Sequence, residues 1–279
     1  MTRVPKFILL VVFAAFVGCG PKPPAAPNDP APVVAPPGQV ADAAARDTAI
    51  ANLTAIGEAL HAYENAMGTF PPASATTDGK GLSWRVQILP QFGKEGEDLY
   101  AKFRPLEPWD SPNNKALIDQ MPAVYASPGK PAEKGQTYLR GFIGSTAFFD
   151  ANPPAMPVVG EITTARGRRD TDIVDARGDT LAVAEAAEPV IWTKPDELPC
   201  DGKTLPKLGG VFPHGFHGLL VDGEVYWFPG TTRDATLQAT FTIAKNDVAD
   251  LTPVKYPTGL PTAELPTNPP DTLPAAAAR

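Results

Sequence analysis

The sequence predicts an α+β fold in which a long N-terminal amphipathic helix packs on a mainly antiparallel sheet. Apolar residues recur every three or four positions in the first structured segment, and Asp222-Gly223 separates two β-rich runs near the C-terminus. Short strand-like and helical segments lie between these two features. One long helix followed by strands, without regular alternation of strands and helices, is typical of the α+β class.

The first 19 residues form the predicted export signal. Arg3 and Lys6 precede an uncharged run of twelve residues, 7–18. This run is shorter than the roughly 20 residues that span a bilayer, and it is typical of the apolar region of a signal peptide. Val-Gly-Cys at 17–19 resembles the lipobox of bacterial lipoproteins, with Phe16 where that pattern prefers Leu. We therefore expect an acyl anchor such as palmitate on Cys19, the alternatives being a plain secretory signal or an uncleaved anchor.

Two proline-rich segments flank the expected domain. The chain of 279 residues contains 34 prolines, an excess for a compact fold. Residues 20–40 are predicted to be a disordered, extended linker, and residues 252–279 a disordered Pro- and Ala-rich tail. The intervening residues 41–251 have the length of a single domain.

A helix is predicted over residues 41–67. Its apolar side chains are spaced three or four residues apart, which places them on one face: Ile50, Leu53, Ile56, Leu60, Tyr63 and Met67. Gly68 suits the position after a helix end, and Pro71 and Pro72 prevent continuation. This face is expected to pack against the sheet.

The middle of the chain gives shorter signals. Residues 84–88 alternate apolar and polar side chains like a strand, although Leu82 and Leu89 also fit a helical turn. Ser111 and Pro112 predict a capped start for a short helix over 115–121. Further elements are expected as a helical turn at 98–103 and as strands at 137–149 and 180–185.

The strongest hairpin signal lies at Asp222-Gly223. An Asp-Gly pair between apolar, β-rich runs is typical of a tight hairpin turn. The expected strands are 219–221 and 224–228. Residues 234–244 then form a helix, or a strand in their last part.

Charge and cysteine content argue against nucleic-acid binding, a disulfide framework and a cysteine zinc cluster. The formal net charge is −7, so the chain lacks the basic surface that nucleic-acid binding requires. The chain has two cysteines, and lipidation of Cys19 would leave no second cysteine for a disulfide with Cys200. A disulfide framework or a cysteine zinc cluster is therefore not expected.

Candidate sites are few. His214 and His217, with Asp222 or Glu185, offer nitrogen and oxygen ligands for a divalent metal, the alternative being two loop histidines beside a turn. A hydrolase would use Glu185 with one of these histidines. Four tryptophans are candidates for a carbohydrate platform or for the core: Trp84, Trp109, Trp192 and Trp227. No nucleotide-binding or calcium-binding motif is present, and we predict no catalytic residues and no cofactor.

Three stretches resemble a large bacterial family of unknown function, the domain-of-unknown-function 1559 family, which is associated with prepilin-like processing. They are NLTAIGEALHAYENAMGTFPPA at 52–73, GLSWRVQILP with the later EPWDSP at 81–112, and VAEAAEPVIWTKPDEL with the later LPKLGG at 183–210. The resemblance implies a pilin-like fold for residues 41–251. It also implies a structural or interaction role like that of pseudopilins.

The chain departs from this family at two places. It lacks the family's prepilin motif and has the lipoprotein-type signal instead. The family's His-x9-Asp-Gly box is shortened to seven intervening residues between His214 and Asp222. We therefore expect a non-catalytic lipoprotein at the bacterial cell envelope, held to the membrane by its lipid and binding an envelope protein or glycan. The alternative is a carbohydrate- or metal-binding module.

Overall fold

The computed structural model describes residues 37–159, 162–200, 204–244 and 251. For residues 37–41, 157–159 and 162 it describes the backbone alone. The predicted signal peptide, Cys19, most of the linker and the tail lie outside the described residues.

Helix α1 (Pro37–Met67) begins four residues before its predicted start. The predicted stripe faces the core, where Leu53, Ile56 and Leu60 are at most 3% exposed. Met67 was wrongly assigned to this stripe, because it is 61% exposed. The chain turns at Gly68, whose φ is +72°, so the next core position is taken by Phe70 instead.

The main sheet has six strands in the order β2-β1-β5-β7-β8, with β6 paired to β1. Neighbours along β1-β5-β7-β8 are antiparallel, whereas β2 and β6 run parallel to β1. The strands are β1 (Gln136–Gly144), β2 (Phe149–Asp150), β5 (Leu181–Ile191), β6 (Leu198–Pro199), β7 (Gly215–Leu220) and β8 (Val225–Pro229). The sheet is therefore mixed and mostly antiparallel.

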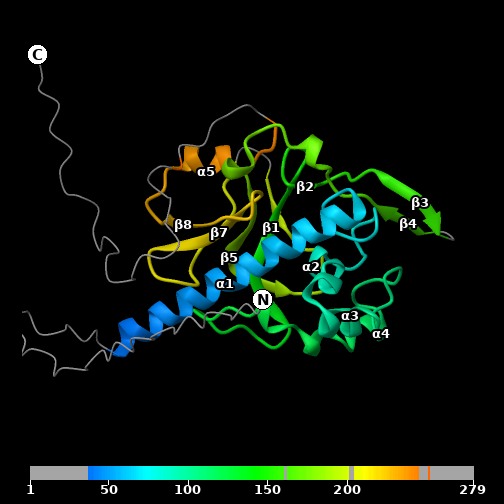
Figure 1. Cartoon of the computed structure of the whole chain (residues 1–279), viewed down its shortest axis with the longest axis horizontal. Coiled ribbons are helices and arrows are strands. Elements are labelled where there is room, and N and C mark those ends of the chain that lie inside the picture. The colour runs from blue at the N-terminus through cyan, green and yellow to red at the C-terminus, as the bar shows by residue number, and fades with distance from the viewer. Residues whose placement is uncertain (1–36, 160–161, 201–203, 245–250, 252–279) are drawn as a thin grey trace, which may run out of the picture. The chain divides into compact units, whose positions relative to one another are not determined.

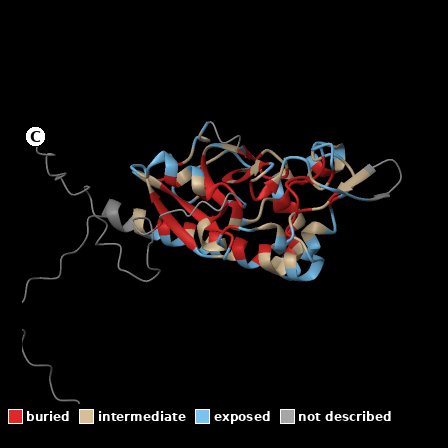
Figure 2. Cartoon of the chain, turned by 90° about the horizontal axis from the view of Figure 1, so that it is seen from above, coloured by how far each residue is buried: buried red, intermediate tan, exposed pale blue. Residues whose placement is uncertain are grey.

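Helices cover both faces of this sheet. Helix α1 crosses one face (Figure 1), where its buried side chains pack with Leu219 and Val225. Helix α5 (Asp234–Thr240) packs on the other face, with Leu220 and Phe228. Alternating residues of β7 and β8 thus enter two separate cores, as the pleat of a strand requires. Buried residues accordingly lie on both sides of the strands (Figure 2). This is the predicted α+β fold in a pilin-like arrangement.

Short helices fill the segment between α1 and the sheet. Residues 84–88 fitted either a strand or a helical turn, and the structure has the helical alternative, α2 (Trp84–Gln87). A four-residue element shows too little periodicity for the sequence to decide between the two. It is followed by the 3₁₀ helix η1 (Leu89–Phe92), α3 (Lys94–Tyr100), α4 (Pro112–Lys115), η2 (Ile118–Gln120) and η3 (Ala123–Tyr125). The cap predicted at Ser111 is confirmed, because its hydroxyl accepts the N–H of Asn114. The helix predicted over 115–121 was wrongly placed, since α4 starts directly after the cap and ends at Lys115, and η2 follows it.

A separate two-stranded hairpin was not predicted. It consists of β3 (Ala155–Val159) and β4 (Ile162–Ala165) and extends to one side of the sheet (Figure 1). The turns η4 (Asp170–Asp172) and η5 (Arg177–Asp179) lead from it into β5. Of the helices that the structure describes, none combines the length and the apolarity needed to span a bilayer.

The predicted hairpin turn at Asp222-Gly223 is confirmed and packs on α1. Oδ1 of Asp222 accepts the N–H of Glu224 at 3.0 Å, and Gly223 has a φ of +92°, a region that favours glycine. A Cβ placed on Gly57 would lie 3.0 Å from Cδ1 of Leu219 and 3.4 Å from Cα of Gly223. Glycine at position 57 therefore permits the close approach of helix and hairpin.

Replacing Gly57 by leucine is expected to lower the free energy of unfolding by about 1–3 kcal/mol, because the larger side chain overpacks this contact. Ala51→Leu on the exposed face of the same helix is the matched control, and it should leave stability nearly unchanged. Urea denaturation followed by circular dichroism measures both. Equal stability of the two variants would show that the helix does not need this close approach.

Candidate functional site

Glu185 and His217 lie side by side on adjacent strands of the sheet. The pairing of Ala184 with Gly218 sets the register of β5 against β7 and brings the two residues together. Oε2 of Glu185 accepts the backbone N–H of His217 at 2.8 Å and lies 3.1 Å from Nδ1 of the same histidine. The residues are 2% and 3% exposed, so the contact lies inside the protein.

Aromatic rings and an arginine from α1 enclose this pair. The imidazole of His217 lies edge-on to the rings of Phe212 and Trp227, with ring centres 5.1 and 4.9 Å away. The guanidinium of Arg46 lies 4.3 Å from the Trp227 ring centre and 5.0 Å from that of Phe212. Arg46 is only 8% exposed, and its Nε also bonds Asp42 at 3.1 Å. The polar pair therefore links β5 and β7 beneath the first half of α1.

Sequence analysis did not identify Arg46 as part of this cluster. It is a single charged residue in an alanine-rich stretch, and nothing in its spacing indicates burial. Its partners Phe212 and Trp227 lie more than 160 positions away, so only the folded chain brings them together.

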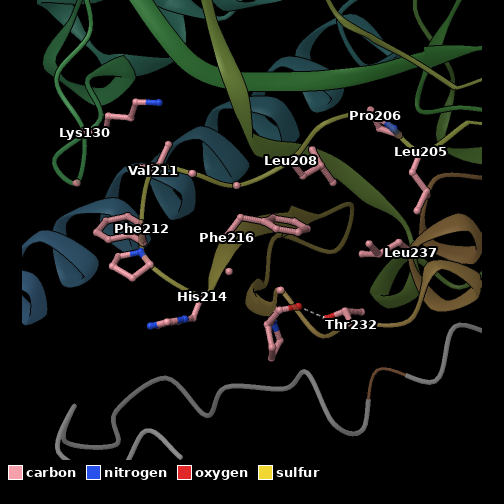
Figure 3. Close-up of a pocket in the computed structure, with 17 residues that line it drawn as sticks. Lys130, Leu205, Pro206, Leu208, Val211, Phe212, His214, Phe216, Thr232 and Leu237 are labelled. Carbon is pink, nitrogen blue, oxygen red and sulfur yellow. Dashed lines mark hydrogen bonds between the residues drawn. The ribbon is translucent and has the colours of Figure 1, made fainter. Parts of the chain in front are cut away.

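His214 has a different environment from His217. It is exposed and has a φ of +67°, and it is the one non-glycine among the described residues with a positive φ. Its carbonyl accepts the N–H of Gly230 at 2.7 Å, which ties the start of β7 to the end of β8. Its imidazole points away from the neighbouring groove (Figure 3).

The candidate metal ligands are therefore brought together only in part. Glu185 and His217 meet, but Asp222 lies in the hairpin turn and His214 faces away. Among the residues that the structure describes, no group of three or more His, Cys, Asp or Glu side chains is placed to hold a metal ion. The Glu185–His217 contact is also close enough for acid–base chemistry, but both side chains are buried, whereas a general acid or base must reach its substrate.

Acidic side chains gather next to the hairpin turn. Burial raises the pKa of the Asp179 carboxyl, and the nearby charges of Asp222 and Asp175 raise it further. Asp222 also approaches Gly178, since a Cβ there would lie 2.8 Å from Oδ2. The turn and η5 therefore lie next to each other.

Three of the four candidate platform tryptophans belong to the core. Trp84 and Trp192 are fully buried and Trp227 is 9% exposed. Trp109 is half-buried, with Nζ of Lys194 6.0 Å from its ring centre. The tryptophans therefore do not form a shared exposed surface.

A buried ion pair joins two of the stretches on which the family resemblance depends. Arg85 of α2 forms two hydrogen bonds with Glu197, Nη1 to Oε1 at 2.8 Å and Nη2 to Oε2 at 3.0 Å. Nε of Arg85 donates to the carbonyl of Leu139, and Oε2 of Glu197 accepts the N–H of Gly141 at 2.6 Å. Arg85 is a polar residue in the alternating run 84–88, and nothing close to it in the sequence indicates that it is buried. It can be completely buried because the carboxylate of Glu197, 112 residues later in the chain, pairs with its guanidinium.

A groove opens beside the loop that precedes β7. It has a volume of about 830 Å³ and lies between this loop, the strand ends at 215–216 and 229–230, and helix α5. Its apolar walls include Leu205, Leu208, Phe212, Phe216 and Leu237. The volume lies in the range of small-molecule sites.

Comparison with known proteins gives one match. A family model with the label SBP_bac_10 and the description "Protein of unknown function (DUF1559)" matches residues 39–247. No curated protein and no solved structure matches the chain.

Proposed function

This chain belongs to the DUF1559 family, and we propose that it is a non-catalytic interaction module, tethered to the bacterial cell envelope by a lipid on Cys19. The observation that carries the non-catalytic part is the burial of Glu185 and His217. Their polar atoms bond each other, and their surroundings are closed by Arg46, Phe212 and Trp227. These are the groups that a hydrolase or a metal site would need to expose.

The sequence before the folded domain supports the proposed lipid anchor. An uncharged run ending in Val-Gly-Cys precedes the proline-rich residues 20–36, which would act as a spacer between membrane and domain. Several acyl chains on Cys19 would anchor the chain stably, since each buried methylene adds about 0.8 kcal/mol. Without the prepilin motif, the pilin-like domain would display a surface at the envelope rather than assemble through a membrane-embedded helix.

Mass spectrometry of the mature N-terminus tests the tether. When the full chain is produced in a bacterial host, we expect a mature protein that begins at an acylated Cys19. Cys19→Ser should remove the acyl mass and release the protein from membranes, and Cys200→Ser is the matched control that should retain both. A mature chain that starts elsewhere and carries no lipid would refute the anchor.

The second candidate function is a metal- or glycan-binding module. The groove beside β7, with a volume of about 830 Å³, favours it. A ligand at a hundred times its dissociation constant adds about 2.7 kcal/mol to the free energy of unfolding. The thermal midpoint of the full chain, measured with zinc, manganese, calcium and a glycan panel, should therefore rise if this candidate is right and stay constant if our proposal is right. His214→Asn, which tolerates the same backbone conformation, shows whether any metal effect depends on the exposed histidine.

A further inference from the structure

The groove beside β7 has walls suited to an apolar peptide. Leu205, Leu208, Phe216 and Leu237 converge on its interior from the loop, the strand and helix α5 (Figure 3). Pro206 and Pro213 extend the apolar wall, and Lys130 lies at the rim. Grooves lined by aromatic and apolar side chains bind proline-rich segments in the polyproline II conformation.

Leu251, the last residue that the structure describes, packs in the apolar cluster next to this groove. This residue is 7% exposed and belongs to the buried cluster on the α5 face of the sheet. Leu205, Leu208 and Leu237 pack against the same cluster and also line the groove. Leu251 therefore belongs to the apolar cluster that three of the groove residues contact.

The sequence after Leu251 has the pattern that such a groove selects. Residues 252–261 read TPVKYPTGLP. A polyproline II helix has about three residues per turn, so Val254, Pro257 and Leu260 would share one edge. Lys255 and Thr258 would lie together on another edge, facing water. At about 3.1 Å per residue the segment would span about 28 Å between its ends.

We propose that residues 252–261 occupy this groove as an extended, proline-rich segment of the same chain. The short connection to Leu251 favours this occupant over a free peptide, because a tethered segment has an effective concentration of about millimolar. An envelope partner that binds in this groove must then contain a similar proline-rich segment, and it must displace residues 252–261 from the groove. This assignment does not depend on the lipid at Cys19.

Photo-cross-linking in the full chain tests the occupant. With benzoylphenylalanine in place of Leu237, we expect a cross-link to residues 252–261 within one molecule. The same group in place of the exposed Met67 is the control and should not reach this segment. Mixing isotopically light and heavy chains separates links within a molecule from links between two. Links to another copy, or no link to the tail, would overturn the proposal.

Substitutions in residues 252–261 give a second test, and they leave the sequence of the folded domain unaltered. Replacing Val254 and Leu260 together by aspartate should free the groove and speed amide exchange across residues 205–216 about tenfold. The matched control replaces Leu265 and Leu273 by aspartate, which adds the same charge farther along the tail. Exchange that is the same in both variants and in the unaltered chain would contradict the proposal.

Discussion

Replacing Glu197 by alanine is expected to lower the free energy of unfolding by about 3–5 kcal/mol, a large part of the roughly 5–15 kcal/mol that stabilises a typical domain. The variant leaves the fully buried guanidinium of Arg85 without its counter-charge. It also removes the acceptor of the Gly141 N–H, which the carboxylate binds at 2.6 Å. Urea denaturation followed by far-ultraviolet circular dichroism measures the loss.

A double variant tests whether the lost stability comes from the unpaired charge. Arg85→Met combined with Glu197→Leu replaces the pair by apolar side chains of similar size, and it should recover much of the stability. The exposed ion pair of Lys134 with Asp119 supplies the matched control, and Asp119→Ala should have no measurable effect. If the Glu197→Ala variant were as stable as the unaltered protein, the Arg85–Glu197 pair would not be what holds α2 to the sheet.

Replacing Leu60 by aspartate tests the packing of α1 on the sheet. Leu60 is 3% exposed and belongs to the core with Leu53, Ile56 and Leu219. Removal of the side chain in Leu60→Ala should cost about 2–5 kcal/mol. Leu60→Asp should cost more, because it also places a carboxylate in this core without a partner.

The control for this prediction is Thr54→Asp, which adds the same charge to the exposed face of α1. It should keep the thermal midpoint near that of the unaltered protein. A small effect of Leu60→Asp, similar to that of Thr54→Asp, would show that the helix is not docked.

Most of the elements were predictable, and so were Glu185 and His217 as candidate site residues, whereas their burial and the part played by Arg46 were not. The spacing of Leu53, Ile56 and Leu60 identified α1 and its buried face. The Asp222-Gly223 pair identified the β7–β8 hairpin. Both signals are local, since a helix face and a tight turn depend on residues only a few positions apart. Helix α2 and the β3–β4 hairpin are too short for such patterns to identify.

The sequence by itself determined that one long helix packs its apolar face on a domain between two proline-rich segments. It also determined the family. Only the tertiary structure decided which polar residues are buried and with what partners. Arg85 meets Glu197, Glu185 meets His217, and Arg46 covers Phe212 and Trp227 across long separations in the chain. The cost of burying a charge depends on the groups that surround it in space, and local sequence does not specify those groups.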